Sequence, residues 1–98
     1  MIKIPFYARF EEPLRNGTKS WTTRSKQYVK KGERFEAFDM CFECDTILEL
    51  ELWRVGLHWR EEGCKSRGDF MTLWEKIHYR VGWLPDKKYV VHIFHRVY

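Results

Sequence analysis

The segment Gly17–Arg24 gathers side chains that can bind an anion or activate a polar bond. Asn16-Gly17 is a dipeptide typical of turns, and the residues after it are expected to be extended, with side chains alternating between two faces. Lys19, Trp21 and Thr23 then share one face, while Ser20, Thr22 and Arg24 share the other. A twist after the glycine would lean Lys19 toward Thr22. Core packing does not require this combination, so it indicates a ligand that is anionic or rich in hydrogen-bonding groups.

The same residues suggest one form of catalysis. A threonine hydroxyl is a weak nucleophile, and a neighbouring lysine amine can serve as its base. The amine of Lys19 must then be neutral, which requires burial or the nearby Arg24 to pull its pKa far below about 10.4. A carboxylate close by would oppose this, because it favours the charged amine.

Charge is distributed unevenly along the chain, although the net charge is only +4. One segment is basic and has Glu33 as its only acid, whereas the segment Glu36–Glu51 has no Lys or Arg. The basic residues are Arg15, Lys19, Arg24, Lys26, Lys30, Lys31 and Arg34. Together with the rings of Trp21 and Tyr28, they predict a groove that follows phosphates and stacks bases. The alternative is a solvated, lysine-rich loop without a partner.

The cysteines raise the question of a metal site. Cys41 and Cys44 form a CxxC pair, and Cys64 follows without a second pair, which a zinc ribbon would need. On a regular strand, Cys41 and Cys44 point to opposite faces and cannot share one ion. We therefore expect no metal and no cofactor, and interpret the cysteines as small apolar residues.

Hydrophobic patterning outlines the strands. Ile2–Phe10 is expected to be a first strand with Pro5 at an edge or bend, followed by one helical turn over Glu11–Asn16. Arg34–Phe38 should begin another strand after a turn at Lys31-Gly32. Ile47–Val55 alternates Leu48, Leu50 and Leu52 with Glu49 and Glu51, which predicts a half-buried antiparallel strand.

The period changes after Ser66. Phe70, Leu73, Trp74 and Ile77 form one stripe of an amphipathic helix, with Ser66 and Asp69 as capping residues. Lys87–Tyr98 is apolar on both faces, as expected for a central strand. The predicted fold class is therefore α+β, a small mixed β-barrel of about five or six strands with two short helices.

The motif Gly17-x-Lys19-x-x-Thr22-x-Arg24 resembles the signature of ASCH domains, small β-barrels of the PUA-like superfamily associated with RNA. The likeness extends over most of the chain in order. It includes Arg9-Phe10, the approach Lys31-Gly32-x-Arg34-Phe35, the acidic element Glu61-Glu62-Gly63, the helix with Trp74 and the closing strand. It implies a single domain over residues 1–98.

The resemblance also implies roles for individual residues. Small bacterial members hydrolyse the acetyl amide of N4-acetylcytidine with a Lys, a Thr and a Glu, which Lys19, Thr22 and Glu62 match. Glu62 can act as a proton carrier and Lys19 as a partner of the oxyanion. Trp21 is bulkier than the usual aliphatic residue, and the stretch after Glu62 differs in length. Without the resemblance, Glu61 and Glu62 would be interpreted as surface acids near a helix end.

These observations leave three functions open. The first is a module that binds RNA or a nucleoside through Lys19, Trp21, Thr22, Arg24 and Glu62, with the basic groove beside them. The second is an amidohydrolase of N4-acetylcytidine-type nucleosides, and the third is an RNA-cleaving enzyme in which Lys and Arg stabilise phosphate.

Composition limits the setting in which the protein works. A hydrophobic fraction of 44% with 17% aromatic residues is typical of a folded globule with some rings left at the surface. No apolar run approaches the ~20 residues of a membrane span, and the amino-terminal residues lack an apolar signal region. We expect a cytoplasmic protein without membrane contact, either a monomer or a homodimer.

Overall fold

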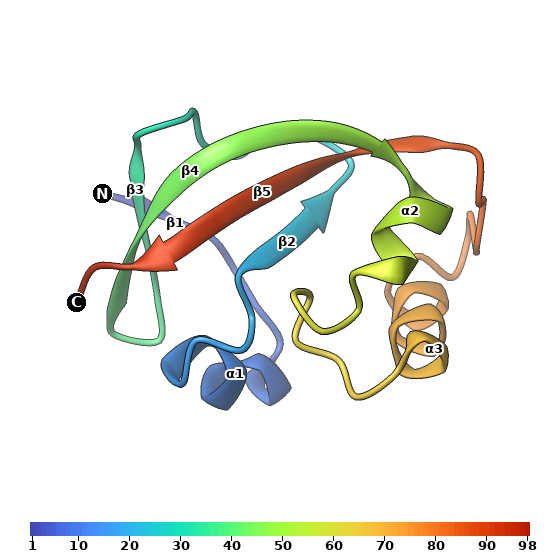
Figure 1. Ribbon diagram of the computed structural model, residues 1–98, viewed down its shortest axis with the longest axis horizontal. Coiled ribbons are helices and arrows are strands. Elements are labelled where there is room, and N and C mark those ends of the chain that lie inside the picture. Colours follow the sequence, from blue (N-terminus) through green and yellow to red (C-terminus); the bar gives the residue numbers. More distant parts are fainter.

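The computed structural model describes residues 1–98 and is built around one strongly curled sheet (Figure 1). The strands are β1 (Ile2–Lys3), β2 (Trp21–Arg24), β3 (Arg34–Ala37), β4 (Met40–Glu51) and β5 (Lys88–Arg96). Their order in the sheet is β1-β3-β4-β5-β2, and β1 with β3 is the one parallel pair. This α+β half-barrel confirms the predicted fold class.

The helices lie on the concave side of the arch that β4 and β5 form (Figure 1). They are a 3-10 turn, η1 (Ala8–Phe10), and the helices α1 (Glu11–Arg15), α2 (Leu52–Leu57) and α3 (Arg67–Ile77). None of them has the length and apolar character that a membrane crossing requires. The buried core draws on the sheet and the helices alike, and includes Phe35, Phe42, Leu14, Val55 and Phe70.

The helix predicted after Ser66 is confirmed as α3. The Ser66 hydroxyl accepts a hydrogen bond from the Asp69 backbone N–H at 3.0 Å, as an N-cap does. Phe70 and Trp74 face the core, whereas Ile77 is more than a third exposed. The predicted central strand is also confirmed, because β5 lies between β4 and β2.

Two predicted strands have the wrong bounds. The first strand ends at Lys3 rather than Phe10, because Pro5 cannot donate to a ladder and the chain then turns into η1. The strand expected over Ile47–Val55 starts earlier, at Met40, and ends at Glu51. Leu52 is buried as predicted, but it begins α2, so strand alternation does not explain its burial.

The turn between β3 and β4 also differs from the prediction. Phe38 was assigned to a strand, but Phe38 and Asp39 both have positive φ, at 50° and 64°. They form the two-residue loop between the paired residues Ala37 and Met40. Such a turn matches the twist of a hairpin and usually carries Asn or Gly, so a phenylalanine gives little signal of it.

Candidate functional site

A loop that follows α2 is fixed against the start of β2. The Glu61 carbonyl accepts hydrogen bonds from the backbone N–H groups of Ser20 and Trp21, at 2.8 and 2.9 Å. Glu62 lies in this turn and not in the short helix that was expected to end beside it, because α2 already ends at Leu57. The carboxylate of Glu62 is thereby brought to Lys19, although the two residues are far apart in sequence.

Lys19 and Glu62 form a buried ion pair. The side chains are only 2% and 6% exposed, and Lys19 Nζ lies 3.6 Å from Glu62 Oε1. The ammonium also donates to the Trp21 carbonyl at 2.7 Å and to the Glu62 carbonyl at 2.6 Å. The Phe10 ring lies 4.4 Å from the same nitrogen. The ammonium therefore makes two hydrogen bonds to backbone carbonyls and one ion pair, and an aromatic face covers it.

Burial and pairing act on this pair in opposite directions. Burial, the largest influence, lowers the pKa of Lys19, and the Glu62 carboxylate opposes that shift. Burial likewise raises the pKa of Glu62, against the influence of Lys19, Thr23 and Arg24. The protonation of each group therefore depends on the balance between the desolvation of its charge and the attraction of its partner.

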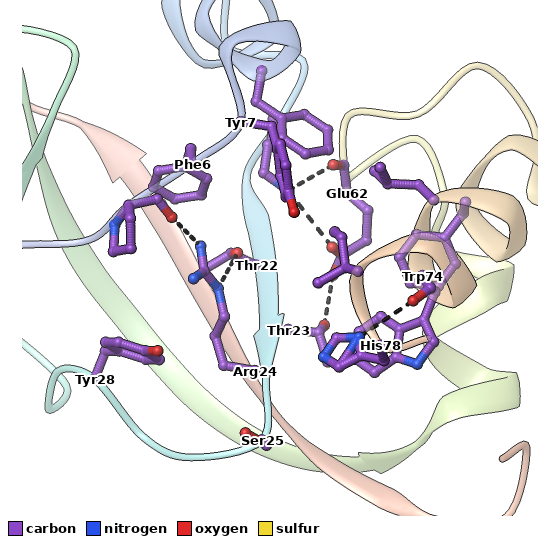
Figure 2. Close-up of a pocket in the computed structure, with 16 residues that line it drawn as sticks. Phe6, Tyr7, Thr22, Thr23, Arg24, Ser25, Tyr28, Glu62, Trp74 and His78 are labelled. Carbon is purple, nitrogen blue, oxygen red and sulfur yellow. Dashed lines mark hydrogen bonds and ion pairs between the residues drawn. The ribbon is translucent and has the colours of Figure 1, made fainter. Parts of the chain in front are cut away.

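The two threonines of β2 have different partners (Figure 2). Thr23 Oγ donates to Glu62 Oε2 at 2.6 Å. Thr22 Oγ accepts a hydrogen bond from Arg24 Nε at 3.2 Å. In Figure 2, Thr22 and Arg24 lie on one side of the β2 ribbon, with Thr23 and Glu62 on the other. This follows strand alternation, which puts Lys19 and Thr23 on one face and Thr22 and Arg24 on the other.

These groups line a cavity of about 480 Å³ between β2, η1 and α3. Its polar lining comes from Lys19, Thr22, Thr23, Arg24, Ser25 and Glu62. Aromatic rings supply much of the rest, from Phe6, Tyr7, Phe10, Tyr28, Phe70, Trp74 and His78 (Figure 2). The structure thus brings the predicted residues Lys19, Thr22, Arg24, Tyr28 and Glu62 to one cavity.

Arg24 lines the cavity near two of its aromatic rings. Its Nη2 donates to the Pro5 carbonyl at 2.7 Å, and its guanidinium lies 5.0 Å from the Phe6 ring and 5.3 Å from the Tyr28 ring. The hydrogen bonds of Arg24 thus go to the neutral oxygens of Pro5 and Thr22. Since Lys19 and Glu62 balance each other, Arg24 leaves the polar side of the cavity with one uncompensated positive charge.

Other predicted residues lie away from the cavity. Trp21 was expected to border it, but its ring stacks on His58 at 4.4 Å and does not line the cavity. Lys30 and Lys31 are exposed on the loop between β2 and β3. Arg34 lies on β3, paired with Glu43 at 3.4 Å.

Lys26 and Tyr28 connect the basic loop to the cavity. Lys26 Nζ lies 5.5 Å from the Tyr28 ring, which itself lines the cavity. The backbone N–H of Tyr28 donates to His92 Nε2 at 3.0 Å, and this bond holds the loop against β5. A ligand that fills the cavity and continues over Tyr28 would therefore reach the first lysine of the loop.

Sequence reasoning missed several residues of the site. Thr23 shares a strand face with Lys19, so alternation alone was enough to place it beside the amine. Tyr7 was assigned to a strand and His78 was given no role, yet both line the cavity. The His78 ring stacks on Trp74 at 4.0 Å. No local pattern identifies these two, because their positions depend on how η1 and α3 pack against β2.

Comparison with known proteins establishes the fold. No family model and no curated protein matches the sequence. Protein EF3133 from Enterococcus faecalis V583, described with the family model DUF984, superposes with a TM-score of 0.69 at 16% identity, over 91% of this chain and 67% of that one. The hypothetical protein PH0355 superposes with a TM-score of 0.73 at 13% identity, over 97% of both chains. At these identities the likeness shows that the chain has the same fold as both.

Proposed function

We propose that the protein binds a nucleoside, either free or as an unstacked base of RNA, in the cavity beside β2. The observation that carries this proposal is the meeting of an aromatic wall with a cluster of fixed polar groups in one cavity. Its volume of about 480 Å³ falls within the range of small-molecule sites. Aromatic rings stack on the faces of bases, and hydroxyl, carboxylate and guanidinium groups match the donors and acceptors of base edges.

The charge of the cavity supports the same class of ligand. With Lys19 and Glu62 paired, Arg24 is the one cation of the lining without a carboxylate partner. This suits a ligand that is neutral or carries a single negative charge, such as a nucleoside or one nucleotide of a chain. Lys26, whose ammonium lies 5.5 Å from the ring of Tyr28, suits a phosphate that flanks such a nucleotide in RNA. The resemblance of Gly17–Arg24 to the ASCH signature favours this class as well.

Nucleoside affinity, measured by calorimetry, tests the proposal. Tyr7 lines the cavity and is 55% exposed, so its ring has a free face, whereas Tyr79 is 73% exposed and lies outside the lining. Loss of one stacked ring costs about 1–3 kcal/mol, so Tyr7→Ala should weaken binding of cytidine or N4-acetylcytidine about tenfold. Tyr79→Ala should leave the affinity unchanged. Equal effects of the two changes, or no nucleoside binding by the unaltered protein, would contradict the proposal.

A second candidate is hydrolysis of an acylated base such as N4-acetylcytidine. One observation favours it: the hydroxyl of Thr23 lies 2.6 Å from the Glu62 carboxylate, a distance at which a nucleophile and its base cooperate. Release of cytidine from N4-acetylcytidine would support this activity, and its absence beside measurable binding would leave the binding module. The RNA-cleaving alternative gains no such support, since the Lys19 ammonium is directed to protein oxygens.

A further inference from the structure

The two threonines at the cavity differ in readiness for nucleophilic attack. Thr23 donates its hydroxyl proton to Glu62 Oε2, so an acceptor for that proton is already in place. Thr22 receives a hydrogen bond from Arg24, which withdraws electron density from its oxygen and occupies one of its lone pairs. Both side chains are nearly buried, at 6% and 4% exposure, and both line the cavity.

We propose that Thr23 is the nucleophile of the acyl-transfer reaction and that Glu62 is its base, in place of the Thr22–Lys19 pairing that the sequence motif suggests. This proposal rests on the hydrolase form of the proposed function. Its substrate class is an amide in which a small acyl group is joined to an exocyclic amine of an aromatic base. The aromatic rings of the cavity hold the base, while Thr23 faces the acyl carbon.

The reaction balances with these groups and water. Thr23 Oγ attacks the acyl carbon, and its proton moves to Glu62 Oε2. The tetrahedral intermediate collapses as the carbon–nitrogen bond breaks, and Glu62 returns the proton to the departing amine. A water molecule, deprotonated by Glu62, then attacks the acyl ester on Thr23. The ester bond breaks, Thr23 Oγ regains the proton through Glu62, and a carboxylic acid leaves.

Lys19 acts in this scheme as a positioning residue. Its ammonium donates to the carbonyls of Trp21 and Glu62 and lies 3.6 Å from Glu62 Oε1, so it is held by two backbone carbonyls and by the carboxylate. No hydrogen bond joins the amine to either threonine hydroxyl, whereas Thr23 donates directly to Glu62, so the geometry assigns the role of base to Glu62. Lys19 thus fixes the carboxylate of Glu62 so that its other oxygen, Oε2, faces Thr23.

Valine variants of the two threonines provide the test, because valine replaces only the hydroxyl by a methyl group of similar size. With N4-acetylcytidine as substrate, Thr23→Val should lower kcat by about 10²-fold or more while KM changes little. Thr22→Val removes a polar group of the cavity lining and should raise KM, but its kcat should fall far less than that of Thr23→Val. Thr23→Ser keeps a hydroxyl beside Glu62 and should retain turnover, and thermal unfolding of Thr23→Val shows whether the valine variant is folded.

The covalent intermediate gives an independent readout. Protein quenched with acid during turnover should carry an acetyl group on the peptide that contains β2, and fragmentation should place it at position 23. An acetyl group on Thr22, or a Thr22→Val protein that is inactive while Thr23→Val remains active, would overturn the assignment and leave the hydrolase function standing. No cytidine release by the unaltered protein would overturn the hydrolase function and this assignment together.

Discussion

Lys19 and Glu62 form a buried ion pair, and the loss of hydration of its two charges costs free energy. A buried ion pair contributes little net stability, because two charges lose their hydration, but removal of one partner leaves an uncompensated charge that costs about 3–5 kcal/mol. Here three neighbours contact the charged groups of the pair. The carbonyl of Trp21 and the face of the Phe10 ring contact the Lys19 ammonium, and the hydroxyl of Thr23 donates to the Glu62 carboxylate. These contacts are better explained by a requirement to hold the two side chains in fixed positions than by a gain in folding stability.

His92 fixes the other side of the site. It is fully buried, and its Nε2 accepts the Tyr28 N–H at 3.0 Å, so the ring proton must lie on Nδ1, which donates to the Thr22 carbonyl at 3.1 Å. One neutral imidazole therefore joins β5, β2 and the loop that carries Tyr28. Burial lowers the pKa of His92, and the positive charge of Arg24 lowers it further.

The stability of the protein should consequently fall as the solution becomes acidic. A folded-state pKa below the unfolded value of 6.5 means that the folded protein binds fewer protons, so the contribution of His92 is complete above pH 6.5 and is lost as pH falls below it. Urea unfolding between pH 5 and 7.5 should show this loss, with a slope of at most about 1.4 kcal/mol per pH unit for one proton.

Glutamine variants of His92 and His78 separate the contributions of these two histidines to the pH dependence of stability. His92→Gln should reduce the pH slope, because no group at that position then titrates. The pKa of His78 is also lowered, by burial and by Lys87. His78→Gln should therefore remove the contribution of His78 to the pH slope and leave the contribution of His92. A His92→Gln protein with the same slope as the unaltered protein would contradict the role given to His92.

At the residue scale, the sequence was a good guide where chemistry is local. The spacing of Lys19, Thr22 and Arg24 correctly indicated a polar cluster at the start of a strand, and all three line one cavity. It was a poor guide to partners across the fold. Trp21 pairs with His58, and Thr23 pairs with Glu62, because the loop after α2 reaches β2, and no local pattern encodes that contact.

Among the elements, the loop with Glu62 depends most on one glycine. Gly63 has φ +84°, and a Cβ built there would lie 2.9 Å from the Cβ of Lys19. The absence of a side chain lets the backbone lie against the stem of Lys19, so that the Glu62 carbonyl can accept from the ammonium. Gly32 has almost the same φ, +85°, with nothing within 4 Å of such a Cβ.

Alanine variants of Gly63 and Gly32 therefore separate the cost of a positive φ from the cost of the close contact with Lys19. Each change should cost about 1–2 kcal/mol for a left-handed conformation, measured by urea unfolding. Gly63→Ala should cost more than Gly32→Ala, because Lys19 must also move, and it alone should weaken nucleoside binding. Equal losses of stability with unchanged affinity in both variants would mean that the loop does not need this close approach.

The predictability of an element depended on how many signals agreed. For α3, the apolar stripe and the Ser66 cap agree on where the helix begins, and its presence and its start were predicted correctly. For β4, the alternation of Leu50 with its neighbours was clear, but it continued in phase into the first residues of α2. The Leu52 N–H still donates to the Lys87 carbonyl at 3.0 Å, next to the last β4–β5 pair, so the side-chain pattern does not mark the change from strand to helix.

For the whole molecule, the segregation of charge follows the order of the sheet. The acidic segment is mostly β4, in the middle of the sheet, whereas the basic loop leaves the end of β2, an edge strand. Arg34 is joined to the acidic side by its pair with Glu43. Lys26 lies beside Tyr28, which lines the cavity, whereas Lys30 and Lys31 lie farther along the loop and away from the cavity. A modest net charge therefore still places cations beside the candidate site.

The curl of the sheet then explains why one cavity collects residues from distant parts of the chain. Residues of β2 line one side of the cavity, residues 5–7 with Phe10 line another, and residues of α3 line a third. The central claim is that a nucleoside occupies this space. Mapping of backbone amide shifts by NMR during titration with N4-acetylcytidine tests it most directly, because it locates the ligand without relying on catalysis.

We expect the amide shifts to saturate at the same ligand concentration and to cluster on the cavity lining. The affected residues should be those of β2, Tyr7, Glu62 and the Phe70–His78 face of α3. Residues of β3 and the exposed half of β4 should remain unchanged and serve as internal controls. Shifts confined to the lysine-rich loop, or scattered over the surface without saturation, would contradict a nucleoside site in the cavity.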